Sequence, residues 1–532
     1  MDTTFISLLF PDAESREKHL AKEGTPNITE DVVDALGLDN LLPLKNSALS
    51  DYFTADPAVM AYRAATLADM ERHPKLSEIL GEILPILADI EELRRLDRAH
   101  GQNAGESYLY SITEIELYVS CIDTLYKGLS GLKEELASPA FTTLANFVTT
   151  LAEGAYYQEL NEGLKKLASH ASEIHSVTIG VNLDAQFRPT EAGVISLNAD
   201  TFKSGRILDK ILRMSWKNDS MTTIAPLAPI SGKSEHMQEA MVSAFRGALD
   251  EVFRSSVRAW RGIVGGYVLD KTDFLLRLLP EIEFVSRAVA LTESLTAKGY
   301  ALTYPTILPA CEKAFRAEGL YNPDVAMRIE DTVVENDIAF DEAAHIYVLT
   351  GPNRGGKSVI TCAMGLAQAM AQLGMRVPAK AAALSPVDGI YTHFPEEAED
   401  TIDKGRLGEE CARLREIFDH VTGESMILLD ESLSSTGAYE AAFIASEILA
   451  GFALAGCRGI FSTHLHELAA GVEEINARVG ARGVRIDTLV AGIEEGARSF
   501  RIHRTKPDGK SYASDIAEKY GLSLSEIEKK LS

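Results

Sequence analysis

The sequence predicts an α/β domain in the C-terminal part of the chain, preceded by a mainly α-helical region that carries a small β-hairpin. From about residue 321 onward, short apolar strands alternate with helices, which indicates a mainly parallel sheet covered on both faces. A glycine-rich turn joins the first of these strands to the first helix. Before this part, apolar residues recur at spacings of three and four, which is typical of helices.

The glycine-rich turn fits the pattern G-x-x-x-x-G-K-[ST], and its flanks fit it too. Residues 346–350 form a β-branched and aromatic run typical of a buried strand, and residues 359–373 favour a helix that ends at Gly374. Such a turn directs successive backbone N–H groups and the positive end of the helix dipole at one anion. A chance glycine-rich turn is the alternative, and the flanks argue against it. We therefore expect a nucleotide to be bound by the residues of this turn, which are Gly351, Pro352, Asn353, Arg354, Gly355, Gly356, Lys357 and Ser358.

Within the turn, Lys357 is expected to reach the β- and γ-phosphates, and the Ser358 hydroxyl is expected to bind Mg²⁺. A second strand, residues 426–430, ends in the two carboxylates Asp430 and Glu431. We expect Asp430 to hold Mg²⁺ and Glu431 to act as the general base that activates water.

A third strand, residues 459–463, is followed by His464. A lone histidine at a strand end is more often structural than functional. The carboxyl edge of a parallel sheet is where α/β proteins bind ligands, however, so we expect His464 to sense the γ-phosphate. Between the second and third strands, residues 438–455 favour a helix.

We predict an N-terminal lead over residues 1–30, a helical core and lever domain over 31–320, and the α/β domain over 321–532. Alternation with period two over residues 176–183 and again over 193–198 predicts the β-hairpin inserted between helices. Asp56 is the expected N-cap of a helix that begins with Pro57, and Pro85 is expected to kink or divide a later one.

The composition and the N-terminus indicate in which compartment the protein functions. The net charge of −26 argues against a surface that is basic throughout, although a local basic stripe remains compatible with it. Five scattered cysteines without C-x-x-C spacing indicate reduced thiols, with neither a zinc site nor a disulfide framework. The N-terminus lacks the features of a signal peptide, and we expect no stretch to reach the length of a membrane span. These observations predict a cytoplasmic protein without a membrane partner.

One basic stripe breaks the acidic pattern. Five cations follow one another at spacings of three, four, three and four, which places them on one face of a helix: Lys203, Arg206, Lys210, Arg213 and Lys217. Such a stripe suits a nucleic-acid backbone, and a solvated helix face is the alternative interpretation.

The motifs of the C-terminal part resemble the ATPase domain of the MutS family. The similarity runs from about residue 336 to the C-terminus and rests on four stretches together: 350–358, 374–379, 429–439 and 461–468. More weakly, Leu36 to Asp39 and Arg63 to Ile90 resemble the helical core domain of that family. The resemblance implies an ABC-type ATPase with long lever helices, ATP and Mg²⁺ as cofactors, and a homodimer in which a loop from each subunit closes the ATP site of the other.

The sequence departs from the family pattern in several places. The chain has no room before its core for the domain that reads mismatches, and Phe394-Pro-Glu396 has the order of the reading motif in the wrong place. The family's Ser-Thr in the trans-acting loop is replaced by Leu407-Gly408-Glu409, where the Gly408 backbone can substitute for a hydroxyl. Val333 and Arg485 stand where the family stacks aromatic groups on adenine. The nuclease module of the family's other branch is also not found.

These observations predict an ATP-dependent DNA-binding protein of the MutS family, more sensitive to the shape of DNA, duplex or branched, than to a mismatch. A sensor of ribosomes or structured RNA is the alternative among nucleic-acid proteins. A protein-remodelling ATPase is the alternative outside that class, and the acidic net charge favours it.

Overall fold

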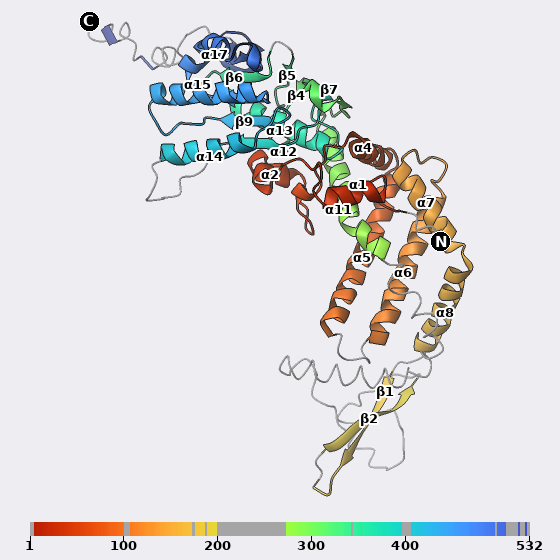
Figure 1. The fold of residues 1–532 in the computed structure, drawn as a ribbon. Helices are drawn as coiled ribbons and strands as arrows, with labels where there is room; N and C mark the ends of the chain where they lie inside the picture. The colour runs from red at the N-terminus through yellow and green to blue at the C-terminus, as the bar shows by residue number, and fades with distance from the viewer. Residues whose placement is uncertain are drawn as a thin grey trace. The chain divides into compact units, whose positions relative to one another are not determined.

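The structure is a computed structural model that describes residues 5–100, 107–172, 176–186, 189–198, 273–341, 344–352, 354–395, 406–494, 497–506, 520–521 and 527–528 (Figure 1). The chain forms two compact units. Unit 1 comprises Met1–Pro74, Leu136–Thr142 and Pro280–Ser532, and unit 2 comprises Lys75–Glu135 and Thr143–Leu279.

Unit 1 contains a six-stranded sheet with the strand order β12-β11-β6-β10-β9-β8. All neighbouring strands pair in parallel except β11 and β12, which are antiparallel. The strands span β6 Ile346–Thr350, β8 Ile390–His393, β9 Met426–Asp430, β10 Arg458–Ser462, β11 Ile486–Glu494 and β12 Ala497–Arg504. The predicted parallel sheet is therefore present, with its antiparallel pair at one edge.

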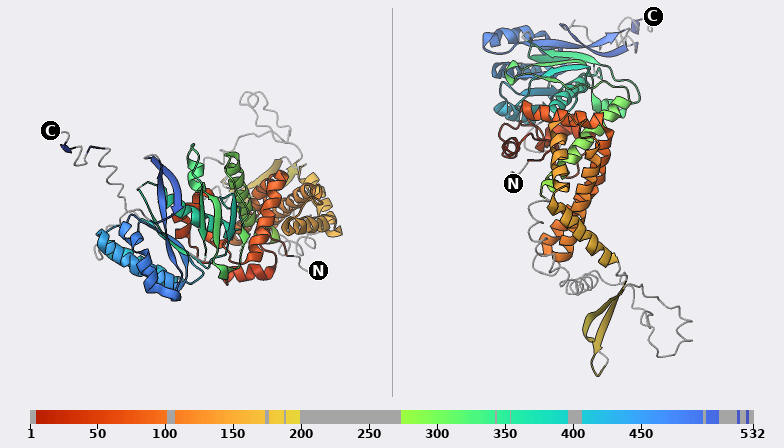
Figure 2. Two further views of the ribbon diagram at one scale, coloured as in Figure 1. Left: turned by 90° about the horizontal axis from the view of Figure 1, so that it is seen from above. Right: turned by 90° about the vertical axis from the view of Figure 1, so that its right-hand side faces the viewer.

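Each central strand is buried on both faces, so its alternate side chains enter two different cores. Val348, Leu429 and Phe461 share one core with α14 Arg406–His420, α15 Ala438–Ala455, α16 His466–Ala470 and α17 Val472–Val479. In both views of Figure 2, the blue helices of this part lie together at one side of the strands.

The other face of the sheet is covered by α13 Lys357–Gln372. A Cβ on Gly365 of α13 would lie 2.6 Å from Leu428 on β9 and 2.6 Å from Leu36 on α2 Glu30–Leu36, so α13 is packed tightly between the sheet and α2. Residues 1–74 thus belong to the same compact unit as the α/β domain. The domain boundaries at 30/31 and 320/321 stay predictions from the sequence.

The remaining elements of unit 1 frame this sheet. A second sheet has the order β3-β7-β4-β5, formed by Thr306–Ile307, Ala381–Leu384, Phe315–Leu320 and Asn336–Phe340. The N-terminal helices are α1 Ala13–Leu20, α2 Glu30–Leu36, α3 Leu38–Leu41 and α4 Pro57–Arg72, and α12 spans Pro323–Arg328. Short 3₁₀ helices span Leu49–Asp51, Ala310–Glu312 and Gly480–Arg482. As predicted, Asp56 caps α4 by accepting a hydrogen bond from Ala58 N, and Pro57 is its first residue.

Helix α15 corrects one prediction from the sequence. Its 18 residues are long and apolar enough to cross a membrane by length and composition, so the expectation that no stretch reaches that length was wrong. Six of its apolar side chains belong to the core against the sheet: Ala441, Ala445, Leu449, Ala450, Phe452 and Ala453. A helix that covers a buried sheet passes the same length and composition test as a membrane span.

In the residues of unit 2 that the structure describes, the chain forms helices and a β-hairpin. The helices are α5 Pro74–His100, α6 Ser107–Ser130, α7 Pro139–Ala152, α8 Ala155–Ser172 and the first residues of α11 Asp273–Ala297. The predicted hairpin is formed by β1 Ser176–Leu183 and β2 Pro189–Asn198 in antiparallel register. Pro85 lies inside α5, which continues as one helix on both sides of the proline and is therefore not divided there.

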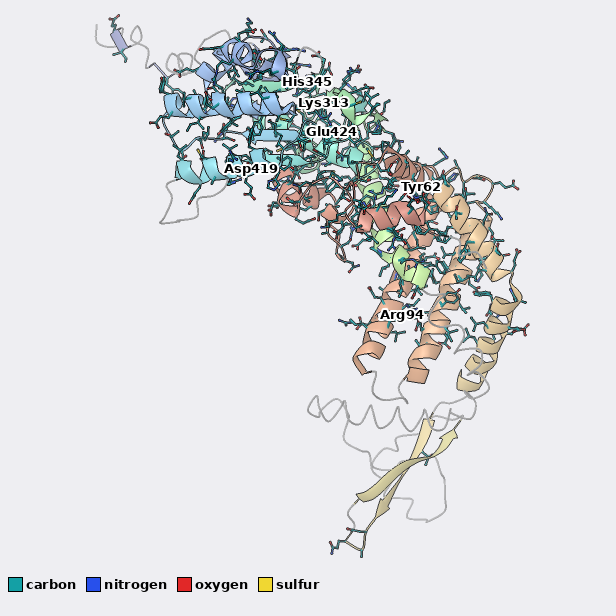
Figure 3. All side chains as sticks on the ribbon, viewed as in Figure 1. Tyr62, Arg94, Lys313, His345, Asp419 and Glu424 are labelled. Carbon is teal, nitrogen blue, oxygen red and sulfur yellow. The ribbon has the colours of Figure 1, made fainter. Side chains whose placement is uncertain are left out.

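Polar contacts join the helices of unit 2. Arg94 of α5, labelled in Figure 3, bonds to Glu114 of α6 at 2.8 Å and to Asp273 of α11 at 2.5 Å. The Tyr157 hydroxyl of α8 donates to Asp123 of α6 at 2.8 Å. These contacts hold the predicted helical region together inside the unit.

Candidate nucleotide site

The glycine-rich turn lies between β6 and α13, as predicted. Gly351 has φ +142° and Gly356 has φ +91°, and both values favour glycine. A Cβ on Gly351 would lie only 2.7 Å from the Cβ of Ala491 on the neighbouring strand β11. The glycines therefore permit both the left-handed backbone and the close approach of β11. Asn353 lies outside the described residues.

Lys357 begins α13 and is buried beneath the turn. Its Nζ donates hydrogen bonds to the carbonyl oxygens of Gly351 at 3.1 Å and Pro352 at 3.4 Å. Burial lowers the pKa of Lys357, while the carboxylates of Glu431 and Asp430 raise it. A bound polyphosphate would supply the stronger anionic partner that this buried ammonium group lacks.

The strand register brings Asp430 to the same edge of the sheet. Ser462 pairs with Leu349 of β6 and with Asp430 of β9, so these three strands end side by side. Figure 3 labels His345 and Glu424, which precede β6 and β9 and mark the opposite, amino edge. The turn, Asp430 and Glu431 thus meet at the carboxyl edge, where α/β sheets bind ligands.

The Asp430 carboxylate fits a Mg²⁺ ion. Burial raises its pKa, and a hydrogen bond from Ser358 lowers it. Its Oδ1 atom is buried and has no hydrogen-bond partner among the residues that the structure describes. In the part of the chain that the structure describes, no group of three or more His, Cys, Asp or Glu side chains can hold a metal. A cation here would therefore take Asp430, Ser358, phosphate oxygens and water, as Mg²⁺ commonly does.

Glu431 follows on a strained backbone. Its φ is +45°, its N–H donates to the Ser462 carbonyl oxygen at 2.8 Å, and its half-buried side chain lines the cavity beside the turn. Ser462 is fixed in turn by a 2.5 Å hydrogen bond between its Oγ and Thr361 Oγ1 on α13. His464 lies two residues after β10 with an exposed side chain that does not line this cavity, so its proposed role as a γ-phosphate sensor stays a prediction.

The cavity beside the turn has a volume of about 480 Å³. Its lining includes the polar or charged residues Lys357, Ser358 and Glu431 and several apolar side chains, which are Val325, Ile329, Val333, Val359 and Phe500. A lining that combines charged and apolar groups suits a nucleotide, whose phosphates and base differ in the same way.

Phe500 is a cavity residue that the sequence interpretation missed. It belongs to β12, has φ +55°, and lies beside the turn, since a Cβ on Gly356 would lie 3.5 Å from its ring. Asn336 of β5 fixes this segment, donating from Nδ2 to the Phe500 carbonyl at 3.1 Å and accepting at Oδ1 from Ile502 N at 2.7 Å. No local pattern in the sequence links this phenylalanine to the glycine-rich turn.

Two sequence predictions about the base pocket have different outcomes. Val333 is buried and lines the cavity. Arg485 does not line the cavity, so its expected place in the adenine pocket was wrong. It precedes β11, at the amino edge of the sheet, and its guanidinium pairs with Glu473 at 3.1 Å.

The structure describes only some of the residues that the sequence predicts to contact a partner subunit or nucleic acid. Gly408 is exposed near the start of α14. Lys203, Arg206, Lys210, Arg213 and Lys217 all lie outside the described residues.

Comparison with known families agrees with this geometry. Residues 347–528 match MutS domain V, and residues 55–298 match the MutS2 N-terminal domain. The chain belongs to the MutS family. Domain V of this family is an ABC-type P-loop ATPase domain, in agreement with the α/β domain described above.

Individual MutS-family relatives cover the chain to different extents. DNA mismatch repair protein MutS of Roseiflexus sp. (strain RS-1) is 34% identical over 220 residues, which are 40% of this chain and 19% of the relative. The MutS protein of Synechococcus sp. (strain CC9311) is 24% identical over 517 residues, which are 89% of this chain and 53% of the relative. Endonuclease MutS2 of Thermus thermophilus is 31% identical over 189 residues, which are 36% of this chain and 24% of the relative. The chain spans about half the length of these relatives, or less.

The site predicts how Lys357→Ala will behave. Loss of the buried ammonium group should weaken nucleotide binding roughly 10- to 100-fold, because a hydrogen bond to a charged group contributes about 1.5–3 kcal/mol. Titration of a fluorescent ATP analogue in the presence of Mg²⁺ measures the change. Lys18→Ala, which removes an exposed lysine of α1, is the matched control. Equal affinities of wild type and Lys357→Ala would contradict the assignment.

Proposed function

We propose that the chain is an ATP-hydrolysing, DNA-binding protein of the MutS family, whose nucleotide state controls its hold on DNA. The observation that carries the proposal is the meeting of the phosphate-binding turn, Asp430 and Glu431 at one edge of the sheet, beside a cavity of about 480 Å³. The printed names of the relatives, a DNA mismatch repair protein and an endonuclease, support the choice of DNA.

Each residue of the site has a distinct role in the proposed hydrolysis. The backbone of residues 351–356 and the Lys357 ammonium group bind and orient the phosphates. Ser358 and Asp430 hold Mg²⁺, which when bound offsets the negative charge of the phosphates. Glu431 accepts the proton of the attacking water, and its anchored backbone holds the carboxylate in place. Val333 and Phe500 line the cavity with apolar surface, against which the base is accommodated.

Glu431→Gln tests the hydrolytic part of the proposal. The amide keeps the shape of the side chain and loses its basicity, so ATP binding should persist while hydrolysis slows about a hundredfold or more. Steady-state ATPase assays and analogue titrations measure the two effects. Glu424→Gln, at the opposite edge of the sheet, is the control (Figure 3). Unchanged turnover in Glu431→Gln would rule out its role as general base.

The working unit in this proposal is a homodimer in which the segment near Gly408 completes the partner's site. Two exposed aromatic side chains in the first turns of α15 support a protein contact at that surface. Tyr439 is 81% exposed and Phe443 is 62% exposed. The ATPase rate per subunit should then rise with protein concentration. A rate that stays constant while the protein is monomeric would contradict this part.

For DNA binding, the proposal predicts an affinity that depends on the shape of the DNA and on the salt concentration. Phosphate contacts position a protein on DNA without reading its sequence, so a single mismatch should not change the affinity. Neutralising Lys203, Arg206, Lys210, Arg213 and Lys217 together should reduce the salt dependence. The log–log slope should fall by up to about 0.9 for each duplex phosphate that the variant no longer neutralises.

A competition titration of homoduplex against single-mismatch duplex, branched DNA and structured RNA at several salt concentrations measures these properties. A clear preference for the mismatch would contradict the predicted mode of binding. Preference for structured RNA, or no binding to any nucleic acid while ATP is hydrolysed, would replace DNA by one of the two alternatives.

A further inference from the structure

A buried histidine lies next to the segment that carries Glu431. His393 ends β8, pairs in register with Leu429 of β9, and is 3% exposed. Its Nδ1 lies 2.7 Å from the hydroxyl oxygen of Ser432, the residue that follows Glu431. The histidine does not line the nucleotide cavity, so any effect on the reaction has to pass through the protein.

The segment after Glu431 needs restraint. Glu431 has φ +45° and Leu433 has φ +65°, and neither residue is glycine. Side chains other than glycine adopt this left-handed backbone at a cost in free energy, which surrounding contacts must offset. Without such contacts the turn would relax, and the direction of the Glu431 carboxylate would change with it.

Three contacts hold the turn. The Glu431 N–H donates to the Ser462 carbonyl oxygen at 2.8 Å, and Leu433 is buried in the core shared by β6, β9 and β10. Between them, Ser432 is tied to His393. When Nδ1–H donates to the Ser432 oxygen, the serine hydroxyl can donate in turn to the His393 carbonyl oxygen at 3.3 Å. This pair therefore restrains the residue that directly follows the proposed base.

The His393 ring keeps one charge state and one orientation. Burial lowers its pKa to about 4, so the ring is neutral near pH 7. Within the described part of the chain, its buried Nε2 has no hydrogen-bond partner, so Ser432 is the polar side chain there that orients the ring.

We infer that His393 is a positioning residue for hydrolysis, which acts through its hydrogen bond to Ser432 to aim the carboxylate of Glu431 at the attacking water. The inference rests on the proposed ATPase activity. A misplaced catalytic group slows the chemical step without weakening nucleotide binding, because the phosphate-binding turn and the apolar side chains that line the cavity are unchanged.

Asparagine and glutamine separate positioning from packing. Asn places its amide close to the position of Nδ1 and can still bond to Ser432, whereas Gln places its amide close to the position of Nε2. His393→Gln and Ser432→Ala should lower kcat about 10- to 100-fold, with ATP-analogue affinity unchanged within about twofold. His393→Asn should recover most of the turnover that His393→Gln loses. The double variant His393→Gln/Ser432→Ala should be no slower than the single variants, because both remove the same interaction.

The experiment measures ATPase kinetics, analogue binding and thermal unfolding for this set, with His420→Gln, an exposed histidine of α14, as the control. If His393→Gln fails to fold, Ser432→Ala carries the test alone. Wild-type turnover in His393→Gln or Ser432→Ala, equal losses in the Asn and Gln variants, or a parallel loss of ATP affinity would overturn the inference and leave the proposed function standing. A wild-type protein that hydrolyses no ATP would overturn both.

Discussion

The candidate site depends on the register between β6, β10 and β9. Because Ser462 pairs with both Leu349 and Asp430, the three strands end at one level and deliver the phosphate-binding turn and the two carboxylates to one place. A shift of one residue in any of these strands would exchange the side chains that enter its two cores. Because α13 covers one face and α14–α17 cover the other, such an exchange would disturb the packing of both cores, which favours the observed register.

Around this edge, left-handed backbone is held by neighbouring contacts. Gly351 and Gly356 shape the turn, and Glu431 and Phe500 adopt positive φ without being glycine. Each of these two has a backbone anchor: the Glu431 N–H bonds to Ser462, and the Phe500 carbonyl bonds to Asn336. Positive φ at residues other than glycine costs about 1–3 kcal/mol each, so their concentration around the cavity is a sign of a functional surface.

The sequence predicted the parts of the site that lie within short segments. The turn at 351–358 and the strand that ends in Asp430 can be recognised in the sequence, because their functional residues lie next to the residues that form the strand or helix. The boundaries of α15 were predicted without error for the same reason, since Gly437 and Gly456 flank an uninterrupted helical run.

What the sequence did not predict depends on contacts between distant segments. Phe500 and Asn336 are joined across 164 residues, and His393 and Ser432 across 39, so no local pattern links them. Arg485 was placed in the adenine pocket by its position along the chain, but the parallel pairing of β11 with β6 carries it to the opposite edge of the sheet. Strand direction, which a linear pattern specifies poorly, decided that outcome.

The central claim is that one nucleotide spans the cavity, with its phosphates on the turn and its base between Val333 and Phe500. Photolabelling of the wild-type protein with 8-azido-ATP and Mg²⁺, followed by mass spectrometry of the peptides, tests it most directly. The account predicts labelling within residues 321–334 or 497–504, and excess ATP should suppress it. Labelling confined to other segments, or labelling that excess ATP does not displace, would contradict the account.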